Sequence, residues 1–179
     1  SGGDLLALSR RANELERTGQ FAEEAKVVRQ ALDLARERWG NESPEVAGWS
    51  AGLAWVLIQA KQPAEAEPAA RAAVAIREKL SGADSPDLAL ARERLGWALL
   101  EQGRQAEAEP VLLAAYEGFK RFETRASLSA AQRVTMSRIA QLLAGLYEAT
   151  QQPDKAAEWR QKAAPPPEPS HDLADATLV

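Results

Sequence analysis

The sequence contains no cysteine and a single histidine, His171. The lack of cysteine excludes disulfide bonds and thiolate zinc sites. No apolar run approaches the 18 or so residues of a membrane-spanning helix, so membrane insertion is not expected. Basic residues do not predominate either, because the formal net charge is −4 and the isoelectric point is about 5.2. This charge argues against a nucleic-acid partner, whose phosphates require a basic surface.

Groups that carry chemistry are equally scarce. No glycine-rich loop precedes a predicted helix, and His171 lies in a polar C-terminal stretch. The repeated glutamates fall at predicted helix starts, where the positive end of the helix dipole explains them without acid–base catalysis: Glu65, Glu67, Glu107 and Glu109. We therefore predict no catalytic residue, no metal site, no cofactor and no enzymatic activity for this chain.

The composition favours helices throughout. Hydrophobic residues make up 45 % of the chain and aromatic residues only 6 %, and the dominant residue types are good helix formers such as alanine and leucine. The chain is therefore predicted to be all-α.

A long internal repeat is the main feature of the sequence. The stretch 53–68 (LAWVLIQAKQPAEAEP) recurs at 95–110 (LGWALLEQGRQAEAEP), an offset of 42 residues. Ser43-Pro44 and Ser85-Pro86 keep the same offset, so the period covers a whole structural unit. Fixed self-similarity at this period predicts stacked helical repeats.

The repeat divides the chain into four predicted helix pairs, with turns near residues 19, 61, 103 and 151. Ser129 and Gln132 have the spacing of a capping box at the start of the seventh helix. We interpret Ser1-Gly2-Gly3 as a cloning remnant on a fragment of a longer protein. The proline-rich, acidic tail is expected to be disordered or docked on a neighbour. The predicted boundaries are 1–3 for the remnant, 4–41, 42–83, 84–128 and 129–164 for the four units, and 165–179 for the tail.

The two outer units depart from the repeat. Unit one has Glu24 where units two and three have Ala66 and Ala108, which places a charge at a helix-packing position and predicts a looser unit. Unit four has about six extra residues before its turn.

The helix pairs resemble tetratricopeptide repeats. Gly103 precedes Ala106-Glu107-Ala108-Glu109, and the unit openings Pro44-Glu45-Val46-Ala47 and Pro86-Asp87-Leu88-Ala89 are similar to the 42-residue repeats of kinesin light chains. The resemblance implies a right-handed superhelical solenoid of four helix-turn-helix pairs. It also implies that the concave groove of the solenoid binds a protein or peptide.

The end of the array has a second resemblance. Residues 145–150 and 154–160 are similar to the repeat regions that follow the catalytic domain in bacterial eukaryotic-type Ser/Thr kinases. This implies a signalling module that docks a substrate or regulator, in the cytoplasm or on the outer side of a membrane-anchored kinase. The alternative is a structural module that forms a homodimer through its last helix pair.

Helical periodicity predicts the residues of the groove. Trp55 lies about 200° around its helix from the core residue Leu53, and Trp97 has the same relation to Leu95. These indoles would either line the groove or pack between successive first helices, whereas Trp39 and Trp159 are expected to pack between units. A groove with apolar anchors and the negative charge of Glu93 and Glu101 would suit a partner with apolar and some basic residues. The predicted partner-binding residues are Trp55, Ile58, Gln59, Leu90, Glu93, Trp97, Leu100, Glu101 and Arg138.

Overall fold

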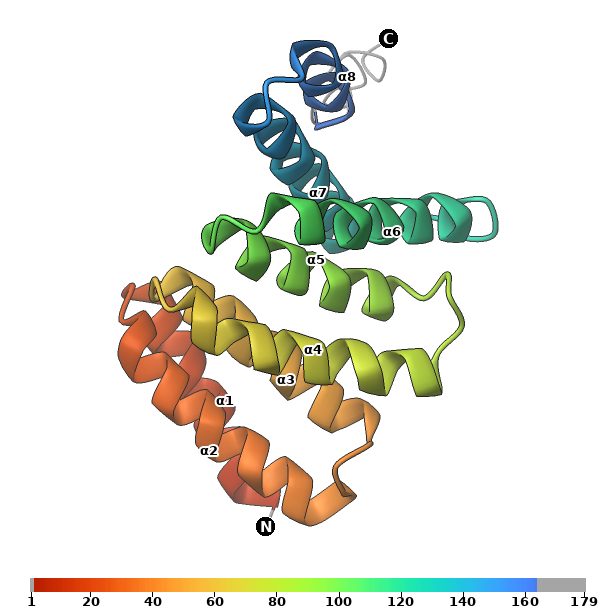
Figure 1. Ribbon diagram of the computed structural model, residues 1–179. Coiled ribbons are helices and arrows are strands. Elements are labelled where there is room, and N and C mark those ends of the chain that lie inside the picture. The colour runs from red at the N-terminus through yellow and green to blue at the C-terminus, as the bar shows by residue number, and fades with distance from the viewer. Residues whose placement is uncertain (1, 164–179) are drawn as a thin grey trace, which may run out of the picture.

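The computed structural model describes residues 2–163, which form eight α-helices and no strand. The helices pair consecutively, and the pairs stack into an elongated array (Figure 1). This confirms the predicted all-α solenoid. The helices are α1 (Gly2–Arg17), α2 (Phe21–Trp39), α3 (Pro44–Gln59), α4 (Pro63–Leu80), α5 (Pro86–Glu101), α6 (Gln105–Glu123), α7 (Ala130–Ala149) and α8 (Pro153–Ala163).

Local sequence determines where several helices begin. Ser43 caps α3, because its Oγ accepts a hydrogen bond from the backbone N–H of Val46 at 3.2 Å, and Pro44 occupies the first helical position. Ser129 and Gln132 bond reciprocally to each other's backbone N–H groups at the start of α7. The predicted capping box is therefore confirmed.

The turn inside each pair has the same geometry in all four units. One residue adopts a left-handed backbone conformation with φ between 57° and 72°. The next residue donates its backbone N–H to a carbonyl five residues earlier, as in a Schellman motif. The left-handed residues are Gly19, Lys61, Gly103 and Gln151, which confirms the predicted turn positions.

The extra residues before the turn of unit four are distributed over α6, α7 and the segment between them. The helix α7 has 20 residues, four more than α3 or α5, and α6 has 19 against 18 for α4. The segment that joins α6 to α7 is one residue longer than the segment that joins α4 to α5.

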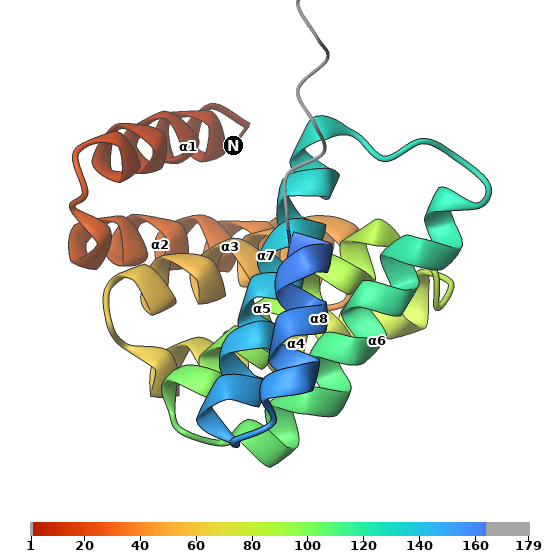
Figure 2. The same cartoon turned by 90° about the horizontal axis from the view of Figure 1, so that it is seen from above.

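In units one to three, the second helix packs between its own first helix and the first helix of the next unit. Small residues permit this close approach, and Ala66, Ala70 and Ala73 of α4 are completely buried. Gly96 of α5 is required for the same reason, because a Cβ there would lie 2.5 Å from Cδ2 of Leu112. Seen along the stack, the first and last pairs point in clearly different directions (Figure 2).

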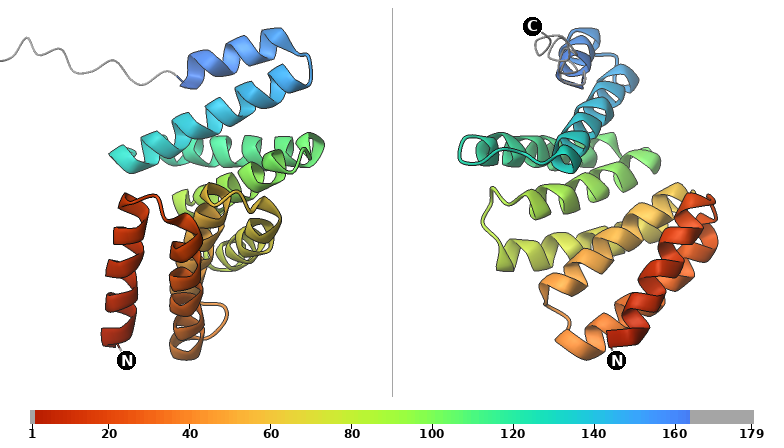
Figure 3. Two further views of the ribbon diagram at one scale, coloured as in Figure 1. Left: turned by 90° about the vertical axis from the view of Figure 1, so that its left-hand side faces the viewer. Right: turned by 180° about the vertical axis from the view of Figure 1, so that it is seen from behind.

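The first helix is the least embedded element. Within residues 2–163, α1 contacts only α2, whereas α3 contacts α2, α4 and α5. Figure 3 shows α1 at the free edge of the first pair. Gly2 and Gly3, predicted as a cloning remnant, belong to α1.

The structure separates the two tryptophans that were predicted to pack between units. Trp159 is buried and meets Tyr116 of α6 edge to face at 4.8 Å between ring centroids, as expected. Trp39 was predicted wrongly, because it is 40 % exposed at the end of α2 with Arg38 stacked on its ring. The tail 165–179, with His171, lies outside the described residues. No helix in the described part of the chain is long and apolar enough to cross a membrane.

Candidate peptide-binding surface

The first helices of the units line the inner side of the array. The backbones of α3 and α5, and those of α5 and α7, approach closely, whereas those of α4, α6 and α8 do not approach one another within the described residues. The stack is therefore tighter along its first helices, as expected on the concave side of a curved solenoid. We define the inner face as the groove-facing residues of α3, α5 and α7.

Two tryptophans occupy equivalent positions on this face. Trp55 of α3 and Trp97 of α5 are both half-buried, with part of each indole packed against the core. Trp55 meets Phe21 edge to face at 6.0 Å. Trp97 donates its indole N–H to Glu101 at 3.3 Å, and the guanidinium of Arg138 lies 5.6 Å from the ring centroid. Each indole therefore keeps an accessible portion and is held in place by neighbouring units.

The other predicted groove residues divide into two groups. Gln59, Leu90, Leu100 and Arg138 are half-buried and Glu101 is exposed, so all five reach the surface. Ile58 and Glu93 do not, because they are 2 % and 0 % exposed. Their assignment as partner-contacting residues is corrected: Ile58 belongs to the core, since α3 is enclosed by α2, α4 and α5.

Glu93 is instead the centre of a buried charge cluster. Its carboxylate accepts a hydrogen bond from Arg94 Nη1 at 2.5 Å and is also bonded by Arg138 of α7. The single carboxylate of Glu93 therefore forms ion pairs with two guanidinium groups. The cluster of Glu93, Arg94 and Arg138 carries a net charge of +1. The expectation that Glu93 makes the groove negative is therefore wrong.

Arg94 is incompletely satisfied in this cluster. Its side chain is only 12 % exposed, and its Nε has no hydrogen-bond partner. Burial lowers the pKa of the Arg94 guanidinium, and the positive charge of Arg138 acts in the same direction while Glu93 opposes it. An arginine that shares its only carboxylate is a candidate for binding a further anion.

A pocket of about 180 Å³ lies beside Arg94 on the inner face. It opens between α3 and α5, and α4 contributes one side chain to its wall. No group of histidine, cysteine or acidic residues within residues 2–163 could hold a metal ion. The pocket is lined by Ala47, Gly48, Ala51, Gly52, Arg77, Asp87, Leu90, Ala91 and Arg94.

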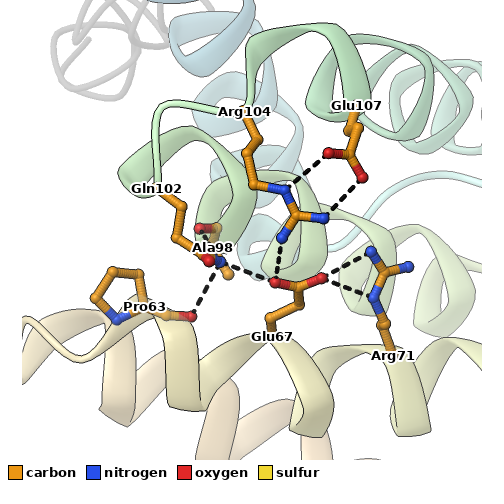
Figure 4. A network of polar contacts seen from close by, with 7 residues as sticks. All are labelled: Pro63, Glu67, Arg71, Ala98, Gln102, Arg104 and Glu107. Carbon is orange, nitrogen blue, oxygen red and sulfur yellow. Dashed lines mark hydrogen bonds and ion pairs between the residues drawn. The ribbon is translucent and has the colours of Figure 1, made fainter.

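A polar network joins units two and three near the α5–α6 turn (Figure 4). Glu67 of α4 accepts hydrogen bonds from Gln102 at 3.0 Å and Arg104 at 2.5 Å, and it pairs with Arg71 at 2.7 Å. Arg104 also holds Glu107 with two bonds, at 2.7 and 2.8 Å. The hydrogen bond from Gln102, followed by those from the arginines, lowers the pKa of Glu67.

The corresponding residue of unit three, Glu109, also bonds to the next unit. It accepts a hydrogen bond from the hydroxyl of Tyr147 at 2.7 Å. Sequence reasoning explained Glu67 and Glu109 by the helix dipole and missed this role. Their recurrence at the same repeat position was the clue, since both lie one residue before a proline inside a helix.

Comparison with known protein families gives a match in the centre of the array. Residues 45–121 match the tetratricopeptide repeat family. This range lies within units two and three, where the internal similarity is strongest. A comparison with curated protein sequences found no match.

Solved structures extend the similarity to the whole array. BtubC (BKLC) from P. vanneervenii has 21 % identity and a TM-score of 0.74, over 98 % of this chain and 69 % of that one. The nearly identical TPR-like repeats of a Podosopora anserina protein named after kinesin light chain have 20 % identity and a TM-score of 0.71, over 89 % of this chain and 72 % of that one. A form of the same repeats with one substitution gives a TM-score of 0.72 with the same identity and coverage. At such identities these similarities show the tetratricopeptide-type fold alone.

Proposed function

We propose that this chain is a docking module that binds an extended or helical segment of a partner protein along the inner face of α3, α5 and α7. The observation that carries the proposal is the pair of half-exposed indoles, Trp55 and Trp97, at equivalent positions of neighbouring inner helices. Tetratricopeptide-type solenoids present extended concave surfaces for binding other proteins. Partly exposed, well-supported aromatic side chains are the usual anchors of such interfaces.

Residues around the indoles extend the surface. Leu90 and Leu100 add half-buried apolar contacts, and Gln59 and Glu101 supply polar groups near the ends of their helices. Such a surface suits a segment with two apolar anchors spaced to meet the two indoles.

The proposal can be tested with the five tryptophans of the chain as reporters. A 12-residue peptide would first be selected on the full chain by phage display. In a titration with this peptide, the indole N–H resonances of Trp55 and Trp97 should shift. Those of Trp39, on the outer side, and Trp159, buried between α6 and α8, should not. Failure to select any peptide, or shifts confined to Trp39, would overturn the proposal.

A finer proposal concerns the parent protein. The similarity of residues 145–160 to the repeat regions of bacterial Ser/Thr kinases supports a role in substrate or regulator docking for such a kinase, with the chain in the cytoplasm. The gene should then encode a kinase catalytic domain upstream of this region. A gene without one would remove this proposal and leave the docking function untouched.

Self-association is the alternative, and the surface of α8 weighs against it. The large apolar residue of α8, Trp159, is buried, and the exposed positions of the helix are mainly charged. A polar outer face is typical of a helix that caps a repeat array. Light scattering should therefore give a monomer mass at all concentrations, whereas a stable dimer would favour the alternative.

A further inference from the structure

The pocket beside Arg94 exists because unit two lacks two side chains that unit three has. Gly48 and Gly52 of α3 occupy the repeat positions of Leu90 and Arg94 in α5, 42 residues later. A Cβ at either glycine would meet nothing within 4 Å, so the space in front of both is open. Glycine inside a helix is destabilising relative to alanine, and no packing contact requires either glycine here.

The walls of this pocket carry an excess of positive charge. Arg94 shares Glu93 with Arg138, and its Nε has no partner. Arg77 of α4, which also lines the pocket, pairs with Asp87 at 3.2 Å and donates to the backbone carbonyl of Pro44 at 3.2 Å. These ion pairs together contain three guanidiniums and two carboxylates, which leaves one positive charge in excess. Arg77 and Arg94 are 16 % and 12 % exposed, so solvent screens them only in part.

The repeat does not require an arginine at the position of Arg94. Leu142 of unit four lies at the same distance before its turn as Arg94 of unit three, so an apolar residue is tolerated at this position. Removal of Arg94 would leave Glu93 and Arg138 as a balanced pair. Arg94 is therefore not needed to neutralise Glu93.

We propose that this pocket binds an acidic side chain, aspartate or glutamate, of the partner segment that occupies the inner face. The inference rests on the proposed docking function. A carboxylate carries the one negative charge that the cluster lacks and accepts hydrogen bonds from guanidinium groups. The pocket lies between the helices that carry Trp55 and Trp97, so one segment would place an acidic residue between two apolar anchors. This reverses the basic character that the sequence predicted for the partner.

Phage display on the full chain supplies the probe for the test. The selected 12-residue peptides should contain a recurrent aspartate or glutamate. Replacement of that residue by its amide, asparagine or glutamine, should weaken binding at least 10-fold in a fluorescence anisotropy titration, because the amide is isosteric but uncharged. The same replacement at any other acidic position of the peptide should have little effect.

Two variants of the protein locate the acidic residue. Gly52→Leu fills the pocket without changing any charge, and its melting temperature should not fall, since a helical glycine in open space is replaced by a good helix former. Arg94→Leu copies unit four. Both variants should bind the acidic peptide and its amide form with equal, reduced affinity. Gly52→Ala, which adds only a Cβ, is the matched control and should keep the preference for the acid.

The outcomes separate this inference from the proposed function. If no peptide is selected, the docking proposal itself fails. If peptides bind but the amide form binds as well as the acid, the carboxylate assignment is overturned while docking stands. If Gly52→Leu retains the full preference for the acid, the acidic side chain binds elsewhere and this pocket is not its site. A stronger preference for phosphoserine than for aspartate at that position would also contradict the assignment.

Discussion

At the scale of single residues, Glu24 is the clearest departure from the repeat. It follows its turn at the same distance as Ala66, Ala108 and Ala156, as the equivalent turn hydrogen bonds show, and these alanines are fully buried. The Glu24 side chain is 4 % exposed, and its Oε2 has no partner. Burial, with a smaller contribution from the charge of Glu16, raises the pKa of Glu24 from 4.5 to about 7.

Glu24→Gln should therefore stabilise the protein at alkaline pH. Because the pKa of Glu24 is higher in the folded state, folding favours the protonated form. Its contribution to stability is fully present below pH 4.5 and is lost as the pH rises through 7. The variant should gain up to roughly 3 kcal/mol over the wild type at pH 8, and little at pH 4.5. Urea unfolding at both pH values measures this difference.

The exposed neighbour Glu23 provides the control. It forms an exposed pair with Lys26, so Glu23→Gln should not reproduce the gain in stability at pH 8. Parallel pH profiles for the wild type and Glu24→Gln would show that the Glu24 carboxyl is solvated in solution.

At the scale of helices, the sequence predicts the turns well because their chemistry is local. Gly19 and Gly103 mark left-handed positions directly. Lys61 and Gln151 adopt the same conformation without a glycine, and only their repeat spacing and local breaks indicated it. The exposure of Trp39 could not be predicted in this way, because it depends on how far the next unit extends over the end of α2.

The first unit should open before the rest of the array. The helix α1 contacts only α2, and α2 carries the buried carboxyl group of Glu24. Regions with few packed neighbours open at lower free energy than the centre of a fold. Hydrogen exchange should therefore show the amides of α1 and α2 exchanging before those of α3–α6. Equal or greater protection in α1 and α2 would contradict this order.

The Glu67 network should stabilise the junction of units two and three. Glu67→Ala removes the acceptor for Gln102, Arg104 and Arg71 and should cost about 1–3 kcal/mol at pH 7 in urea unfolding. Glu65→Ala is the control, because Glu65 forms one exposed pair with Arg29 and should cost less than about 1 kcal/mol. Equal effects of the two changes would mean that the network adds nothing to the junction.

At the scale of the whole molecule, the repeat period predicts the architecture, whereas the charge of the groove depends on contacts between units. The sequence places Glu93 on the face of Trp97, and the structure keeps it near that face. Its burial follows from Arg138, which lies 45 residues later and on another helix. No pattern within one unit reveals that Arg94 and Arg138 share this carboxylate.

The same limit applies to the pocket. The glycines of α3 are visible in the sequence, but the space in front of them depends on the distance between α3 and α5. The proposed partner therefore carries an acidic residue between apolar anchors, whereas the sequence alone suggested basic residues.

We propose that the inner face binds a partner through Trp55 and Trp97. The most direct measurement compares the affinity of a selected peptide for the wild type and for the double variant Trp55→Ala, Trp97→Ala, with thermal unfolding recorded for both. We predict a loss of at least about 30-fold in affinity, because each anchor contributes about 1–3 kcal/mol, with cooperative unfolding retained. Trp39→Ala, the outer-side control, should bind as the wild type does. A double variant that unfolds would make the indoles core residues of the array, and one that folds and binds at full affinity would place the binding surface elsewhere.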